Sequence, residues 1–110
     1  MQIITGANSP ILYDLTVETA VLDITKPLAN AGPDQTVNED TQVTLDGTGS
    51  SDNVGITTYT WTFTDNTTKT VTGPKPTYTF NTPGVYTITL NVTDAAGNWA
   101  TDTVTVIVLD

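Results

Sequence analysis

A strict alternation of aromatic residues and threonines constrains the fold of this chain more than any other feature. Residues 58–64 read Thr-Tyr-Thr-Trp-Thr-Phe-Thr. Successive side chains of a β-strand point to opposite faces of the sheet, so Tyr59, Trp61 and Phe63 share one face. The stretch therefore predicts a half-buried strand that presents three large aromatic side chains to a core.

The same period of two recurs elsewhere in the chain. Residues 41–46 alternate with Val43 and Leu45 facing inward, and residues 86–93 alternate over a length typical of a central strand. Four further strands are predicted, the last of them a weaker edge strand: 35–37, 77–80, 103–109 and 67–72.

Turn-forming residues separate these stretches, above all the Pro83-Gly84 pair and the Gly- and Ser-rich loop at 46–55. The chain also holds 26 threonines and 11 valines, which favour strands. About seven short strands with frequent turns are typical of an immunoglobulin-like sandwich. We therefore predict an all-β fold, an immunoglobulin-like seven-stranded antiparallel β-sandwich.

Charge and composition exclude several classes of function. The chain has twelve acidic residues, three lysines and no histidine, which gives a net charge of -9. Three lysines cannot form the basic face that nucleic acid requires. Without Cys or His, thiol nucleophiles, disulfides, common zinc sites and an imidazole base are absent. No apolar run approaches the roughly 20 residues that span a membrane, so we expect no direct membrane contact.

Four segments, in order, resemble the landmarks of the PKD (polycystic-kidney-disease-type) domain. They are Asn30-Ala31-Gly32-Pro33, residues 47–52, residues 59–63 and residues 83–94. Where that family usually reads Trp-Asp-Phe-Gly-Asp-Gly, this chain has Trp61-Thr62-Phe63-Thr64-Asp65-Asn66, which keeps the two aromatic positions. The resemblance implies a seven-stranded sandwich of the kind found in tandem on archaeal surface-layer proteins, bacterial secreted hydrolases and animal polycystins.

The likeness begins near Leu28, so we expect a PKD-like β-sandwich domain at 28–110. Residues 1–27 are interpreted as a linker and the closing strand of a preceding repeat. Thr16, Val17, Val21, Leu22 and Asp23 recur 87 positions later as Thr103, Val104, Val108, Leu109 and Asp110. The missing leader sequence also leads us to expect a piece of a longer, exported protein.

Acidic residues are expected to gather at one end of the sandwich. Alternate connections of successive antiparallel strands share an end, which places the start of the first strand and loops 46–55, 73–76 and 94–98 together. These segments carry Asp34, Asp46, Asp52, Asp94, Asn30, Asn53 and Asn98. Such oxygens are the ligands of Ca²⁺, which takes six to eight. Alternatively, Asp and Asn side chains only cap turns by bonding their own backbone.

The resemblance narrows the candidate ligands. Some collagenase PKD domains bind calcium near this region through an Asp-rich loop that Ser51-Asp52-Asn53 resembles, although a second loop Asp of those domains falls at Val54 here. In a tandem array Asp23 of the linker is expected near Asp52 and Asp94. These three residues are the candidate metal ligands, and no cofactor other than Ca²⁺ is expected.

Aromatic and glycosylation signals complete the candidate sites. Trp61 is expected in the core, and Tyr86 occupies the place of a corner tyrosine. Trp99 falls on the outward parity of the last strand, where it would stack on a sugar ring, pack on a neighbour or cover its own loop. Asn66-Thr67-Thr68 and Asn91-Val92-Thr93 match the glycan acceptor pattern, and Asn66, on a turn, is the better candidate.

Catalysis is not expected. Paired carboxylates can cleave glycosides, but they need a sugar-sized cleft that the short loops of such a sandwich do not build. We predict a non-catalytic extracellular module that acts as a spacer or adhesion repeat of a cell-surface protein. The alternative is an accessory carbohydrate-binding domain of a secreted hydrolase that uses Trp99 and Tyr13. Expected partners are neighbouring domains of the same chain, other surface proteins or polysaccharide, and the isolated chain is expected to be monomeric.

Overall fold

The computed structural model describes residues 22–110, and the regular elements of this part are strands. Seven strands are present in it: β2 (Gln35–Asn38), β3 (Gln42–Thr44), β4 (Ile56–Asp65), β5 (Thr67–Thr72), β6 (Thr77–Thr79), β7 (Gly84–Asp94) and β8 (Trp99–Leu109). The predicted all-β class is confirmed. Between residues 22 and 110, no helix is long and apolar enough to cross a membrane.

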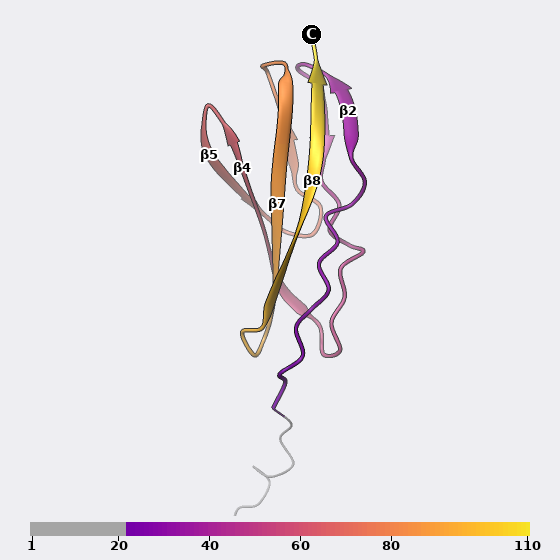
Figure 1. Cartoon of the computed structure of the whole chain (residues 1–110), viewed down its shortest axis with the longest axis vertical. Helices are drawn as coiled ribbons and strands as arrows, with labels where there is room; N and C mark the ends of the chain where they lie inside the picture. Colours follow the sequence, from indigo (N-terminus) through magenta and orange to yellow (C-terminus); the bar gives the residue numbers. More distant parts are fainter. Residues whose placement is uncertain (1–21) are drawn as a thin grey trace, which may run out of the picture.

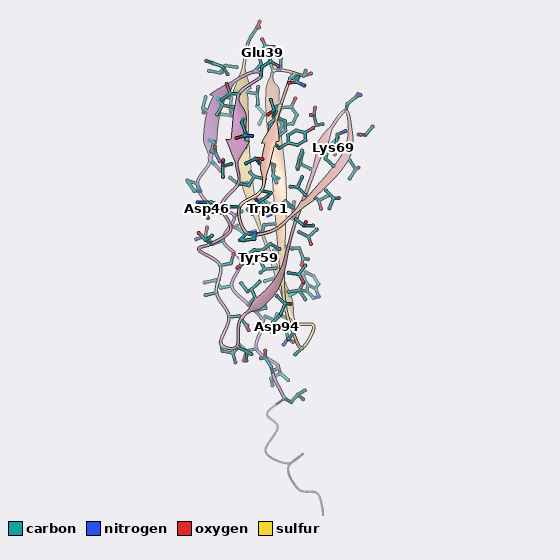
Figure 2. The ribbon with its side chains drawn as sticks, turned by 180° about the vertical axis from the view of Figure 1, so that it is seen from behind. Glu39, Asp46, Tyr59, Trp61, Lys69 and Asp94 are labelled. Carbon is teal, nitrogen blue, oxygen red and sulfur yellow. The ribbon has the colours of Figure 1, made fainter. Side chains whose placement is uncertain are left out.

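The strands form two layers (Figure 1). A five-stranded sheet has the order β2-β8-β7-β4-β5, and a two-stranded sheet pairs β3 with β6. In Figure 1 the larger sheet lies in front of the smaller one, and Figure 2 shows the reverse view. The sandwich was expected to be antiparallel throughout, but β2 runs parallel to β8, with Gln35 opposite Val106. Both strands run towards the same end of the molecule, which makes their pairing parallel.

The core lies between the two sheets and follows the predicted alternation. Trp61 and Phe63 of β4 are buried, as are Val43 and Leu45 of the facing layer. Trp61 is fully enclosed, and its indole Nε1 donates a hydrogen bond to the carbonyl oxygen of Gly73 at 2.8 Å. This hydrogen bond satisfies the polar N–H group of the indole, while burial removes the apolar surface of the ring from water. The central strands supply the remaining inward side chains: Ile88, Leu90, Val92, Val104, Val106 and Val108.

An aromatic cluster closes the end of the core that lies near the C-terminus. The rings of Phe63, Tyr78, Phe80 and Tyr86 lie with centroids 4.2 to 5.5 Å apart. Tyr86 donates its hydroxyl hydrogen to the Thr82 carbonyl oxygen at 2.6 Å, which confirms its structural corner role. Tyr78 donates to Asp65 Oδ2 at 2.6 Å, and this bond, with burial, raises the pKa of Tyr78 to about 12.

One strand is longer than the sequence predicted, and one ladder is shorter than its two strands. β8 begins at Trp99 rather than at Thr103, because it stays paired with β7 as far as Thr93 opposite Trp99. The β4–β7 ladder, by contrast, stops at Thr62 opposite Thr89, although both strands continue. The β4–β5 hairpin then diverges from β7 (Figure 1).

The N-terminal part of the described chain is attached along the sandwich. Leu28 forms an isolated bridge with Ser51. Further along, the Ala31 N–H donates to Asp102 Oδ2 at 2.8 Å, and the Thr105 N–H donates to Asp34 Oδ1 at 2.9 Å. Residues 22–27 form no strand. Residues 1–21, which include most of the predicted closing strand of a preceding repeat and Tyr13, lie outside the described residues.

Candidate functional site

Three carboxylates from distant parts of the sequence meet at one end of the sandwich. Asp23 lies before the first strand, Asp52 in the long β3–β4 connection and Asp94 at the end of β7. One carboxylate oxygen from each lies within 4.8 Å of the other two. Figure 2 shows Asp94 at this end, near the start of the described chain. We call these three residues the acidic cluster.

Asp94 is the buried member of the acidic cluster, with 2% of its surface exposed. Its Oδ1 accepts hydrogen bonds from the backbone N–H groups of Ala96 (3.0 Å) and Asn98 (2.9 Å), and its Oδ2 accepts one from Asn98 Nδ2 (3.0 Å). Burial raises the pKa of Asp94, but these hydrogen bonds outweigh it and hold the pKa below its ordinary value. Asp94 is therefore ionised at neutral pH.

Asp23 approaches this buried charge from the linker side. Its Oδ1 accepts a bond from the Thr25 N–H at 3.0 Å, and its backbone oxygen accepts one from Asn98 Nδ2 at 2.8 Å. The bond from Thr25 lowers the pKa of Asp23, but partial burial and the Asp94 and Asp52 carboxylates together raise it above its ordinary value. Burial is the largest of the causes that raise this pKa, and the two neighbouring carboxylates add to it.

Asp52 leaves one oxygen without a partner. Its Oδ2 accepts hydrogen bonds from the N–H groups of Val54 and Gly55, both at 3.1 Å. Its Oδ1 is buried and has no hydrogen-bond partner among residues 22–110. A buried oxygen of this kind loses its hydration without compensation unless a water or a cation meets it.

The acidic cluster combines the two alternatives that the sequence left open. Each of its carboxylates accepts a hydrogen bond from the backbone N–H group two residues further along the chain, as the turn-capping interpretation expects. The same carboxylates also converge from three segments and carry like charge, which turn capping alone does not require. Hard oxygen ligands in this arrangement suit a cation such as Ca²⁺.

The predicted gathering of all four loops at one end is wrong in part. Asp46 lies level with Trp61, away from Asp94 (Figure 2), and its Oδ1 accepts bonds from the N–H and hydroxyl of Thr48. Asp34 instead bonds the β8 backbone at Thr105. The Gly73 turn also lies midway along the sandwich, because β5 ends opposite Thr60, in the middle of β4. Strand order indicates an end but not how far each strand reaches.

Trp99 lies on the outward side of β8, beside the acidic cluster. It follows Asn98 directly and is 55% exposed, as the parity of the last strand predicted. Its role in binding a ligand or a neighbour stays a prediction. Asn66 lies exposed in the β4–β5 turn with a φ of 69°. Its use as a glycan acceptor stays a prediction too.

Sequence reasoning missed the roles of two polar residues. Asn98 was named only as a residue whose side-chain oxygen could bind a metal ion. Its Nδ2 group instead donates hydrogen bonds to Asp94 Oδ2 and to the backbone oxygen of Asp23, which joins the N-terminal segment to the β7–β8 loop. Asp102 holds the N-terminal segment at Ala31. The sequence did indicate this role, because an Asp at an inward position between Ala100 and Val104 needs a hydrogen-bond donor.

Comparison with known proteins assigns the family. The family model described as the PKD domain matches residues 24–108, most of the chain. The chain belongs to the PKD domain family. This PKD domain is similar to the mouse dyslexia-associated protein KIAA0319-like protein, with 39% identity over 110 residues and 94% of the chain covered. The chain spans only 10% of that relative's length.

A solved structure gives a second likeness to this PKD domain. It is described as the structural basis for the promiscuous specificity of carbohydrate-binding modules from the β-sandwich superfamily. The match has a TM-score of 0.66 and 29% sequence identity, and it covers 80% of this chain and 36% of the other. Both comparisons agree with the immunoglobulin-like β-sandwich, and both are to modules or segments of larger chains.

Proposed function

We propose that this PKD domain is a non-catalytic extracellular module that acts as a spacer or adhesion repeat in a cell-surface protein. The observation that supports this most directly is the placement of the ends. The described chain starts at one end of the elongated sandwich, and the C-terminus lies at the other (Figure 1). A module of this shape lengthens a chain when copies follow one another. The family and the larger length of the mouse relative agree with such an array.

The spacer function is tested with two modules in tandem, Asp110 of the first being followed directly by Ile24 of the second. This junction follows the 87-residue repeat, in which Asp110 corresponds to Asp23. We expect small-angle X-ray scattering to give a maximal dimension close to twice that of one module. A tandem whose maximal dimension stays near that of one module would have folded back on itself and would contradict a spacer.

The acidic cluster gives the junction a chemical role, and we propose that it binds Ca²⁺ there. Three carboxylates within 4.8 Å and the unpaired Asp52 Oδ1 support this. The opposite end of the module is acidic as well, since the neighbouring Asp110 carboxylate raises the pKa of Glu39. Joining two such ends brings like charges together, and a bridging cation removes that repulsion.

Terbium luminescence tests the cation site directly, because Tb³⁺ takes the place of Ca²⁺ and is excited through a nearby indole. Trp99 adjoins Asn98, which contacts two residues of the acidic cluster. We expect sensitised emission that Ca²⁺ displaces and that Asp52→Asn abolishes. Emission that Asp52→Asn leaves unchanged would place the ion elsewhere, and absence of emission would contradict the site.

A second candidate function, accessory carbohydrate binding, has its own support. Trp99 is exposed, and the similar solved structure concerns carbohydrate-binding modules. Aromatic rings with free faces are suited to stacking on sugars. Titration with soluble polysaccharides should shift the Trp99 emission, and Trp99→Ala should remove the shift. No shift with any polysaccharide would leave the spacer function alone.

Extracellular placement has an independent readout at Asn66, which we propose as an N-glycan acceptor in a host that has the pathway. Its exposure on the β4–β5 turn supports access by the transferase. Secretion from a eukaryotic cell line should add one glycan that Asn66→Gln removes. Secreted protein without this glycan would contradict the assignment.

A further inference from the structure

In the part of the chain that the structure describes, the outward face of the five-stranded sheet carries no charged side chain. The side chains of β4 and β7 that point away from the core alternate with buried ones such as Trp61, Phe63, Ile88 and Leu90. The same alternation holds along β8. Most outward positions of β4, β5, β7 and β8 are threonines: Thr58, Thr60, Thr62, Thr64, Thr68, Thr70, Thr72, Thr87, Thr89, Thr93, Thr101, Thr103 and Thr105. We call this surface the threonine face.

The strand register arranges these threonines in rows that cross the sheet. One row runs Thr70, Thr62, Thr89, Thr103, and each member is the direct cross-strand partner of the next. Neighbouring strands lie about 4.8 Å apart, so the row presents hydroxyl groups at that interval. Trp99 stands at one end of the face, opposite Thr93. A ligand that crosses the sheet along this row would meet regularly spaced hydroxyls, and a chain that also extends along β8 from Thr103 would reach the indole ring of Trp99.

A groove interrupts the threonine face where the β4–β5 hairpin leaves β7. Its volume is about 650 Å³, and outward residues of three strands line it, among them Thr62, Thr68, Val85 and Thr89. The β4–β7 ladder ends beside it, at Thr62 opposite Thr89. Val85 is 70% exposed and gives the groove an apolar side. Hydroxyl groups facing a small apolar surface match the alternating polar and apolar faces of a sugar chain.

Charge decides which occupant fits this face. The chain carries a net charge of -9, yet none of that charge lies among the outward side chains of the sheet. A second copy of the chain would bring a second charge of the same size close by, which opposes face-to-face pairing. Anionic polysaccharides are disfavoured for the same reason. An uncharged ligand avoids this cost.

We propose that the threonine face, with its groove between β4 and β7, binds a neutral polysaccharide chain. Threonine hydroxyls donate and accept hydrogen bonds to sugar hydroxyls, while Trp99 and Val85 contact the apolar faces of the rings. This inference rests on the second candidate function, accessory carbohydrate binding, and names the surface and ligand class for it. It does not depend on the spacer function.

Affinity electrophoresis of the 110-residue chain tests the proposal, with mixed-linkage β-glucan, galactomannan and hydroxyethylcellulose as neutral probes and alginate as the anionic one. The test variant is Thr62→Val with Thr89→Val, which removes two hydroxyls from the groove and keeps the side-chain shape. The control is Thr44→Val with Thr77→Val, a cross-strand pair on the smaller sheet. Melting temperatures of both variants verify that the fold is kept.

We expect at least one neutral probe to retard the chain and alginate not to. The groove variant should bind about tenfold to a hundredfold more weakly, since each of the two lost hydrogen bonds weakens binding roughly threefold to tenfold. The control should bind normally. Retardation that the groove variant leaves unchanged would overturn the threonine face while keeping the carbohydrate function. If no neutral probe retards the chain, both the threonine face as a binding surface and the carbohydrate function are overturned. Concentration-dependent dimers that occupy the face would overturn both as well.

Discussion

Trp61 is the largest fully buried side chain among residues 22–110. It is fully buried, and Gly47 lies so close that an added Cβ would come within 2.9 Å of the indole ring. We expect Trp61→Ala to lower the free energy of unfolding by about 3 to 5 kcal/mol, out of roughly 5 to 15 in total. Trp99→Ala is the matched control and should shift the denaturation midpoint little. Equal losses in the two variants would contradict the assignment of their faces.

Asp23 has an effect on stability that changes sign with pH and with calcium. Because its pKa is raised in the folded state, stability falls as pH rises above the ordinary value of 3.8 and through the raised pKa. In EDTA at pH 7, Asp23→Asn should therefore melt at a higher temperature than the parent chain, and the gain should vanish at low pH. In saturating Ca²⁺ the parent should be the more stable of the two.

Asp34→Asn serves as the control for this comparison, since it removes the same charge from a residue outside the acidic cluster. A gain in melting temperature of equal size in both variants would reflect the overall charge of -9 rather than the cluster. A lower melting temperature for Asp23→Asn in EDTA would show that Asp23 is not repelled by its neighbours.

At the scale of elements, the corner before β7 is the clearest target. The Tyr86 hydroxyl bonds the Thr82 carbonyl across the turn, and its ring packs against Phe80 at 4.2 Å between centroids. Tyr86→Phe keeps the ring and removes the bond. We expect a loss of about 0.5 to 1.5 kcal/mol, measured by urea denaturation, with faster hydrogen exchange confined to this turn. An unchanged midpoint would show that the hydrogen bond adds nothing to the packing.

Period-two alternation predicted most strands and core residues because each depends on local sequence. It placed Tyr59, Trp61 and Phe63 inward and Trp99 outward, and the structure confirms this. The parallel β2–β8 pair was not predicted, since it depends on where two distant segments meet. For the acidic cluster, loop order named Asp52 and Asp94, the resemblance singled out Asp52, and the tandem-array argument added Asp23. Loop order also wrongly placed Asp34 and Asp46 (Figure 2) at the same end.

At the scale of the whole molecule, three features belong together. The ends of the described chain lie at opposite ends of an elongated sandwich (Figure 1). The acidic cluster lies at one of these ends, and the outward face of the described strands is uncharged. An array of such modules would bring acidic residues together at its junctions and leave the outward faces of its larger sheets free for neutral partners. Calcium at the junctions would then set the stiffness of the array.

Thermal unfolding in calcium tests the central claim, that the acidic cluster is a cation site. Extracellular modules bind Ca²⁺ with dissociation constants of about 10⁻⁴ to 10⁻³ M. A ligand at a hundred times its dissociation constant stabilises by about 2.7 kcal/mol. We predict that 10 mM Ca²⁺, on the order of this excess for the tighter sites, raises the melting temperature by several degrees above an NaCl control of equal ionic strength. Asp52→Asn should remove that difference. Superimposable melting curves in the two salts would show that the acidic cluster only caps turns.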